Sequence, residues 1–281
     1  MLKQLRADLY KLFRSRVMWI CYAVCVALFV FFTSSYYTPP TPYDTFTIVD
    51  RVDCVITAML IHQDIVTYAI VLSACQFLSK DYDTKFFKNI SDKSLTSRLY
   101  QVLSKMVCML ILVISIYLLW LGINVANAAA RYYGKYGMGF FYGVENMFDK
   151  NRNPLLEIKY TVVEWIKSDA LYLLLAFAAT TIIMAMASVF RNTYATTLTA
   201  LCWSVASQFL FLVLDPLFKL EDITLRHFTV FGGMIGTIDA INFAKMEWDL
   251  HVADKMIAVS IIAIAICSII SWLVSYHREE R

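Results

Sequence analysis

The sequence predicts an all-α, polytopic membrane protein, and three observations carry this prediction. Of the 281 residues, 59% are hydrophobic and only 17% are charged, whereas soluble domains carry about 25% charged residues. The mean hydropathy is +0.60. Long apolar runs recur along the chain. This composition disfavours a soluble enzyme, a nucleic-acid-binding protein and a disordered chain, and the net charge of +3 does not by itself suggest a polyanionic partner.

Six apolar runs are long enough, or nearly so, to cross a membrane. A helix needs about 20 apolar residues for this, because lipid cannot bind the backbone polar groups. The runs occupy residues 17–33, 54–79, 106–126, 170–190, 195–215 and 256–276. We therefore expect six transmembrane helices in a single transmembrane domain, residues 1–281. The first run follows a basic segment, but no small-residue cleavage site comes after it, so we interpret it as a retained span.

The distribution of Lys and Arg predicts which side each loop occupies. Basic residues outnumber acidic ones in segments 1–16, 80–105, 191–194 and 277–281, taken together. Acidic residues outnumber basic ones in segments 34–53, 127–169 and 216–255. Because cytoplasmic loops retain positive charge, we expect both termini in the cytoplasm and the second set of segments outside.

Residues 1–16 are expected to form an amphipathic helix at the cytoplasmic interface. Leucines recur at helical spacing on one face, and basic residues lie elsewhere on the helix. Two interpretations remain open: a membrane anchor, or a helix that also contacts a partner protein.

Segment 80–105 is expected to be a cytoplasmic loop that docks a soluble protein. It alternates charges of both signs and contains an aromatic pair, Phe86 and Phe87. An aromatic anchor with a charged rim is typical of protein interfaces. The alternative is a solvated connector between two spans.

This loop resembles the cytoplasmic loop of permeases in type-2 ATP-binding-cassette (ABC-2) exporters. That family's pattern is an acidic residue, Tyr, then Gly-Thr-x-Lys-Asn, then Ser-Arg, and a Ser-Lys pair that opens the third span. The matching residues here are Asp81, Tyr82, Lys88, Asn89, Ser97, Arg98, Ser104 and Lys105. Lys85 and Phe86 replace the family's Gly-Thr. The amino-terminal segment is similar too, with Asp8-Leu9-Tyr10-Lys11-Leu12, then Arg14-Ser15, and Trp19 in the first span.

The resemblance implies a transporter subunit that works with partners. In that family the amino-terminal helix and the first cytoplasmic loop contact a separate ATPase subunit, and two permease subunits pair. Segment 80–98 would then couple the chain to the ATPase, through Asp81, Tyr82, Asp83, Phe86, Phe87, Lys88, Asn89 and Arg98. ATP and Mg²⁺ would be bound by the partner, because the chain contains no Gly-x-x-x-x-Gly-Lys-Ser/Thr loop and is not expected to be an enzyme.

Polar residues inside the predicted spans are candidates for a substrate path. His62 and Asp64 lie in the second run, and a buried charge in a membrane tends to face protein or water. Alternatively, the second span begins later and leaves both residues near the outer headgroups. Ser204, Gln208 and Asp215 form one stripe of the fifth run. Such a stripe lines a path or binds neighbouring helices.

The outer segments are expected to be peripheral. Segment 216–255 contains an apolar stretch, 228–241, that is too short and too rich in Gly to span, so we expect re-entrant or interfacial helices there. Segment 127–169 is polar and aromatic, and forms either a small cap or a loop on headgroups. The seven cysteines lie in apolar runs without metal-ligand spacing, so no metal site is expected.

Together these features predict the permease subunit of an ATP-driven exporter in a bacterial cytoplasmic membrane. The resemblance implies amphipathic peptides, antibiotics or lipid-like molecules as substrates. The main alternative is a membrane sensor or immunity scaffold that binds a partner and transports nothing. A membrane-embedded enzyme acting on lipid is disfavoured, because the four histidines show no metal-binding spacing.

Overall fold

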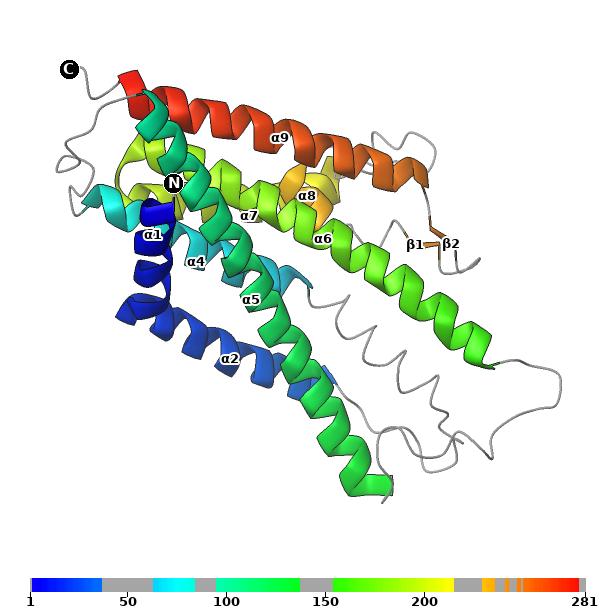
Figure 1. Cartoon of the computed structure of the whole chain (residues 1–281). Coiled ribbons are helices and arrows are strands. Elements are labelled where there is room, and N and C mark those ends of the chain that lie inside the picture. The colour runs from blue at the N-terminus through cyan, green and yellow to red at the C-terminus, as the bar shows by residue number, and fades with distance from the viewer. Residues whose placement is uncertain are drawn as a thin grey trace.

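Long helices lying side by side dominate the computed structural model of the chain (Figure 1). It describes residues 2–36, 63–83, 95–136, 154–214, 229–235, 241–242, 247–248 and 250–277. The helices are α1 (Leu2–Arg14), α2 (Arg16–Tyr36), α4 (Gln63–Asp83), α5 (Leu95–Tyr136), α6 (Pro154–Phe190), α7 (Thr193–Leu214), α8 (Val230–Ile235) and α9 (Leu250–His277). The fold is therefore helical, as expected.

One departure from the all-helical expectation occurs between α8 and α9. The strands β1 (Ile241–Asn242) and β2 (Glu247–Trp248) pair antiparallel, with Ile241 opposite Trp248 and Asn242 opposite Glu247. This pair falls in segment 216–255, for which only helices were expected. Backbone polar groups must be paired in either geometry, and a short hairpin achieves this as well as a helical turn does.

Three of the described helices are long and apolar enough to cross a membrane, against the six spans expected. Their spanning segments are Arg98–Asn127 in α5, Ile166–Phe190 in α6 and Val252–Ser275 in α9. The pair α1 and α2 qualifies only jointly, with a 54° bend between the two helices. The apolar part of α4, Ile65–Lys80, is shorter than a span, and residues 54–62 of the expected second run lie outside the described part.

Several helices extend beyond the apolar runs that predicted them. Helix α5 begins at Leu95 and includes the last part of the expected loop 80–105. It continues to Tyr136, and α6 begins at Pro154, so both ends of the expected outer loop 127–169 are helical. An apolar run indicates only the part of a helix that can lie in lipid. The backbone hydrogen bonds of the helix continue through the polar residues on either side of that run. Proline is also favoured in the first turn of a helix, where its missing N–H costs nothing.

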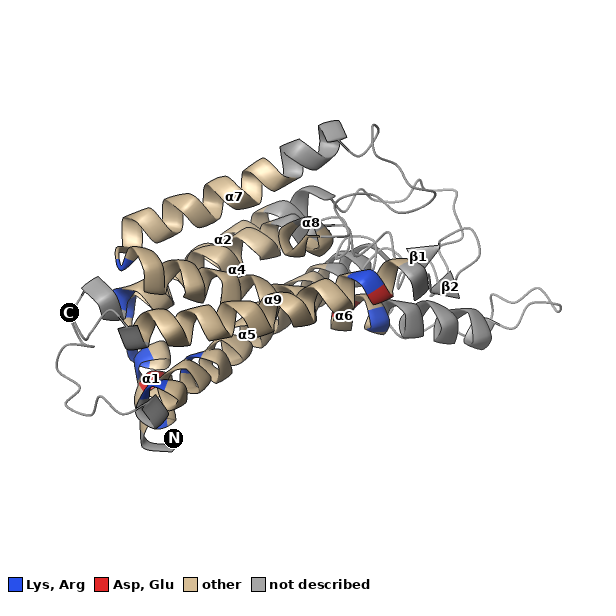
Figure 2. Ribbon diagram, turned by 90° about the horizontal axis from the view of Figure 1, so that it is seen from above, with Lys and Arg blue, Asp and Glu red and all other residues tan. Residues whose placement is uncertain are grey.

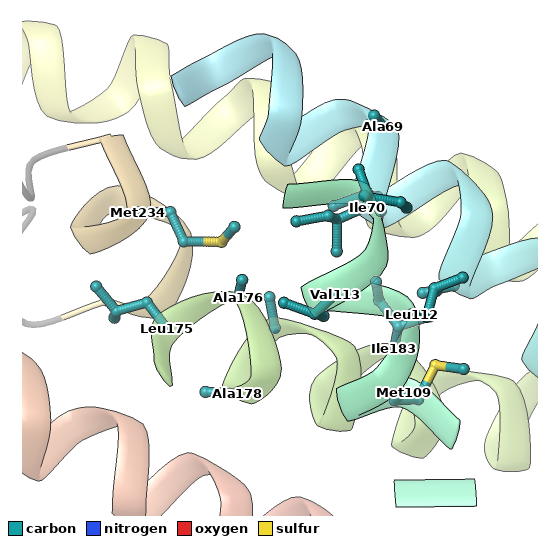
Figure 3. Close-up of a cluster of buried hydrophobic side chains, with 14 of the residues drawn as sticks. Ala69, Ile70, Met109, Leu112, Val113, Leu175, Ala176, Ala178, Ile183 and Met234 are labelled. Carbon is teal, nitrogen blue, oxygen red and sulfur yellow. The ribbon is translucent and has the colours of Figure 1, made fainter. Parts of the chain in front are cut away.

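The core lies where α4, α5 and α6 meet (Figure 3). Ile70 of α4, Leu112 and Val113 of α5, and Ala176 and Ile183 of α6 are buried there. Alanines on α6 allow close helix packing, which replaces the missing hydrophobic driving force between helices in lipid. In the most apolar part of each spanning segment, 61% of α6 is buried inside the protein, whereas only 11% of α9 is. Helix α6 is therefore central, and α9 is peripheral.

Helix α8 is a short buried helix that packs mainly on α6 (Figures 1 and 3) and also contacts α7 and α9. Val230, Phe231 and Met234 are buried. Gly233 faces α6 so closely that an added Cβ would lie 3.1 Å from Leu175 Cδ2 and 3.8 Å from Met256 Cγ. Glycine thus permits α8 to enter the helix bundle. Helix α8 lies within the stretch 228–241, for which the sequence predicts re-entrant or interfacial helices.

Charged residues gather at the two ends of the bundle and leave an uncharged band between them (Figure 2). We call the end that holds α1 and the end of α9 the basic end. Among residues with described side chains, its acidic residue is Asp8, and its basic residues are Arg6, Lys11, Arg14, Arg16, Lys80, Arg98, Lys105 and Arg191. The opposite end, which we call the far end, carries charges of both signs: Lys167, Asp169, Asp254 and Lys255.

A two-residue turn at the basic end joins α6 to α7. Arg191 has a φ of 52°, and its N–H donates to the Ala187 carbonyl over 2.9 Å. Asn192 caps α7, because its Oδ1 accepts hydrogen bonds from the N–H groups of Tyr194 (2.8 Å) and Ala195 (3.1 Å). The left-handed residue ends one helix and the cap starts the next, so the turn is tightly specified.

This turn yields a paired prediction. Asn192→Ala should lower stability by about 1 kcal/mol, because two amide groups lose their cap, while Asn192→Asp should retain it. Arg191→Gly should raise stability by roughly 0.5–1 kcal/mol, because glycine adopts a positive φ without strain. Thermal unfolding in detergent measures both, and equal effects of the Ala and Asp variants would contradict the capping role.

Substitutions at two glycines, one in α8 and one in α5, test the packing of α8. Gly233→Val should destabilise the protein by about 1–3 kcal/mol, because the added methyl groups overlap Leu175. Gly122 in α5 has no atom within 4 Å of an added Cβ, so Gly122→Ala should leave stability unchanged or raise it slightly. A Gly233→Val variant that unfolds at the wild-type temperature would show that α8 does not enter the core.

Candidate functional site

A buried carboxylate joins α1 to α5 at the basic end. Asp8 is fully buried, and its Oδ2 accepts a 2.6 Å hydrogen bond from Ser104 Oγ. Gln4 Nε2 donates to the same oxygen over 3.3 Å. Residues 8 and 104 belong to the two segments that carry the resemblance to ABC-2 permeases, and the structure places them in direct contact. We call Gln4, Asp8 and Ser104 the Asp8 cluster.

The amphipathic pattern of α1 explains why Asp8 lies inside. Leu5 and Leu12 lie about one turn before and after Asp8 and pack on the core. The apolar face of α1 therefore contacts α5 rather than only lipid. This packing carries Asp8 into the interface, where the Ser104 hydroxyl compensates part of its lost hydration.

Arg98, an expected coupling residue, lies inside the bundle rather than on its surface. It is 2% exposed, and its Nη1 donates to Gln101 Oε1 over 3.2 Å. Lys105, also nearly buried, places its Nζ 5.7 Å from the centre of the Phe77 ring of α4. The first contact lies within α5, and the second connects the basic end of α5 to α4.

The other expected coupling residues are placed only in part. Asp81, Tyr82 and Asp83 form the last turn of α4, where the backbone alone is described. Phe86, Phe87, Lys88 and Asn89 lie outside the described residues. Lys80, directly before this segment, donates from Nζ to Ser15 Oγ over 3.4 Å. The start of the expected coupling segment therefore lies beside the junction of α1 and α2.

The outer face of α1 is exposed at the basic end. Tyr10 and Phe13 are more than half exposed. The Arg14 guanidinium lies 5.1 Å from the centre of the Tyr10 ring and donates to the Tyr10 hydroxyl. Tyr194, in the first turn of α7, is 87% exposed at the same end. Sequence reasoning placed both α1 and segment 191–194 on the cytoplasmic side, and indicated the latter as a second, smaller contact with the partner.

A second buried polar cluster connects three helices toward the far end. The hydroxyls of Thr67 in α4 and Tyr172 in α6 are 3.1 Å apart. The ring centres of Tyr172 and Tyr117 in α5 are 6.0 Å apart. The Tyr117 hydroxyl approaches the carboxylate of Asp169 in α6 without completing a hydrogen bond of normal geometry. With the buried Ser168, we call these residues the far polar cluster.

Sequence reasoning missed the far polar cluster. Asp169 ended the expected outer loop 127–169, so it was interpreted as a loop residue. Because α6 begins at Pro154, Ser168, Asp169 and Tyr172 instead share one side of a helix. This i, i+1, i+4 spacing of polar residues before an apolar run was the available signal.

The expected substrate-path residues are only partly described. His62 and Asp215 lie outside the described residues, and only the backbone of Asp64 and Gln208 is described. Asp64 is in the first turn of α4, one turn before Thr67, so the backbone places it next to the far polar cluster. Ser204 of α7 is fully buried, and its hydroxyl has no hydrogen-bond partner among the described residues.

Within the described part of the chain, no three His, Cys, Asp or Glu residues form a group that could hold a metal ion. The cysteines described there, at 21, 25, 75, 108, 202 and 267, are free thiols. A comparison of the sequence with family models and with curated proteins finds no match.

The Asp8 cluster can be tested by a double-mutant cycle. Ser104→Ala should lower stability by about 1.5–3 kcal/mol, because a buried carboxylate loses a charge-assisted hydrogen bond. Asp8→Ala combined with Ser104→Ala should cost less than the sum of the single changes by roughly 1–2 kcal/mol. Thermal unfolding in detergent measures the cycle.

The control for this cycle is Ser260→Ala. Ser260 is equally buried, but its hydroxyl donates only to Met256 of its own helix, over 2.7 Å. Its loss should cost less than about 1 kcal/mol. Strict additivity of the Asp8 and Ser104 changes would contradict the contact between α1 and α5.

Proposed function

We propose that the protein is the membrane-spanning permease subunit of an ATP-driven ABC-2 exporter. Six helical crossings form the domain, a second permease subunit pairs with it, and separate ATPase subunits bind ATP and Mg²⁺. The cargo is an amphipathic peptide, an antibiotic or a lipid-like molecule.

The contact between Asp8 and Ser104 carries this proposal. The resemblance rests on two segments that are far apart in the sequence, and a fortuitous match would give no reason for them to meet. Their 2.6 Å hydrogen bond makes them one structural unit at one end of the bundle. In the proposed transporter this unit is the place where force from the ATPase enters α5.

The charge distribution supports the proposed orientation. Basic residues dominate the end that holds α1 and the end of α9, and charges of both signs occur at the far end (Figure 2). By the positive-inside rule the basic end faces the cytoplasm, so both termini are cytoplasmic. The membrane is the cytoplasmic membrane of a bacterium, since the resembled family is mainly bacterial.

The proposed mechanism is a shift between two states. The ATPase docks on the exposed face of α1 and on segment 80–98, and its closure displaces both. The Asp8 cluster transmits this displacement to α5, which packs against the central helices α4 and α6. The permease itself carries out no covalent chemistry, because its work is to bind cargo differently in the two states.

The cargo path is proposed along the polar residues of α4 and α7. Asp64 marks its outer part beside the far polar cluster, and Ser204 and Gln208 mark the stripe on α7. His62 and Asp215, which lie outside the described residues, are the remaining members of the proposed path. The buried Ser204 hydroxyl, unpartnered among the described residues, supports a polar lining there.

Copurification tests the ATPase partnership. The tagged full chain, expressed in its native host and extracted in mild detergent, should retain a protein that hydrolyses ATP. The double variant Tyr10→Ala, Phe13→Ala should reduce this bound ATPase activity about tenfold or more, because exposed aromatics act as interface anchors.

The matched control is Val125→Ala combined with Ile166→Ala, which removes exposed apolar side chains from α5 and α6 away from the basic end. It should retain the bound ATPase. If no ATP-hydrolysing protein copurifies with the wild type, the transporter proposal fails, and a sensor or immunity scaffold becomes the better account. If both double variants lose the bound ATPase activity equally, the exposed face of α1 is not part of the interface with the ATPase.

A further inference from the structure

Three polar atoms of the far polar cluster are buried without a hydrogen-bond partner in the described part of the chain. They are Asp169 Oδ1, the Tyr117 hydroxyl and Ser168 Oγ. Native proteins pair nearly all such atoms with protein, water or a ligand. Several unpartnered atoms within one cluster therefore point to a missing chemical group rather than to separate local defects.

The charge and hydrogen-bonding capacity of the cluster define that group. Asp169 is only 9% exposed, and an ionised carboxylate accepts hydrogen bonds but donates none. A buried charge is costly in apolar surroundings unless an opposite charge compensates it. The missing group must therefore donate hydrogen bonds, and a positive charge on it would stabilise the carboxylate.

Two aromatic rings also favour a positively charged ligand. The ring centres of Tyr117 and Tyr172 are 6.0 Å apart, Tyr117 approaches Asp169, and Tyr172 lies about one turn after Asp169 on α6. Tyrosine faces attract cations, most strongly where water is excluded. A carboxylate flanked by two tyrosines matches an ammonium group, which carries three N–H donors and no acceptor.

Among the described residues, three charged side chains besides Asp169 lie at this end: Lys167, Asp254 and the half-buried Lys255. Lys167 precedes Asp169 by two residues, which places it about 200° away around the helix, and it is exposed while Ser168 and Asp169 are buried. Asp254 of α9, at the same end, is exposed. None of these three side chains contributes to the electrostatics of the Asp169 carboxylate.

The location of the cluster permits entry from the far end. Asp169 directly precedes the apolar run 170–190 of α6, so it lies where that run ends toward the far end of the bundle. An amphipathic molecule can place its charged group at this depth while its apolar part remains in lipid. On α5, Asn124 lies two turns beyond Tyr117, and its buried Oδ1 also has no partner among the described residues.

We propose that the far polar cluster binds a primary ammonium group, with Asp169 as its counter-ion and Tyr117 and Tyr172 as its aromatic walls. The inference rests on the proposed function and narrows it: the cargo is an amphipathic molecule that carries an amine. The amine belongs either to a cargo molecule or to an aminophospholipid headgroup, which share this chemistry.

The test measures ligand binding to the purified full chain, without any ATPase. The protein is placed in phosphatidylcholine nanodiscs in an amine-free buffer, and its thermal unfolding is followed against n-octylammonium, n-octyltrimethylammonium and n-octanol. Binding to the folded state raises the unfolding temperature. Octylammonium should stabilise most, the quaternary ion less because it has no N–H donor, and octanol least.

Substitutions assign the effect to the cluster. Asp169→Asn should weaken octylammonium binding about tenfold to a hundredfold, because a charge-assisted hydrogen bond is lost. Asp254→Asn, the matched control at the same end, should bind as the wild type does. If Asp169→Asn does not fold, Tyr117→Phe keeps the ring and removes the hydroxyl, and should lower the preference for octylammonium over the quaternary ion.

Two outcomes would overturn the proposal. One is equal stabilisation by octylammonium and octanol in the wild type. The other is unchanged octylammonium binding in Asp169→Asn, which would mean that Asp169 carries a proton and serves only to pack α5 against α6. Because no ATPase is present, these failures are distinct from loss of the ATPase in the copurification experiment.

A further arm identifies the source of the amine. Replacing phosphatidylcholine by phosphatidylethanolamine should raise the wild-type unfolding temperature and compete with octylammonium if the site takes the lipid headgroup. Absence of competition, with octylammonium binding intact, assigns the site to the amine of a cargo molecule. In both cases the response must disappear in Asp169→Asn.

Discussion

The structure depends on one constraint: in an apolar environment, every polar group must find its partner within the protein. Backbone groups meet this constraint by forming helices, which make up nearly all of the described chain. Polar side chains gather into clusters between helices for the same reason, although some of their atoms have no partner among the described residues. The Asp8 cluster and the far polar cluster are both of this kind, and the uncharged band separates them (Figure 2).

Helix α6 links the two clusters through the core. Its alanines pack closely against α4 and α5, and α8 rests on its Leu175 through Gly233. At the far end it contributes Asp169 and Tyr172, and at the basic end it finishes in the capped turn at Arg191 and Asn192. Because interiors packed this densely do not deform continuously, a displacement of α5 at one end must be accommodated along α6. In the proposed transporter, this is how events at the basic end would reach the ammonium site.

Each end holds a buried carboxylate with one oxygen unpartnered among the described residues, and the two ends differ in the groups around that carboxylate. At the basic end, Asp8 Oδ2 accepts hydrogen bonds from Ser104 and Gln4, while Asp8 Oδ1 has no partner among the described residues. At the far end, Asp169 and Tyr117 approach each other without a completed bond, and neighbouring atoms are unpartnered among the described residues. A lasting contact between two helices needs hydrogen-bond partners within the protein. A site for a transient ligand needs polar groups whose hydrogen bonds the ligand supplies.

The sequence by itself determined the helical class, the apolar runs and the bias of basic charge toward certain segments, because these follow from composition and local periodicity. It also selected Asp8 and Ser104, although only as separate motifs. Only the tertiary structure decided that these two residues touch, that Arg98 is buried and that α5 and α6 extend into the expected loops. It alone assembled the far polar cluster, because Thr67, Tyr117 and Asp169 come from three helices and no local pattern relates them. Contacts between distant residues depend on how helices pack, and helix packing is set by side chains on several helices at once.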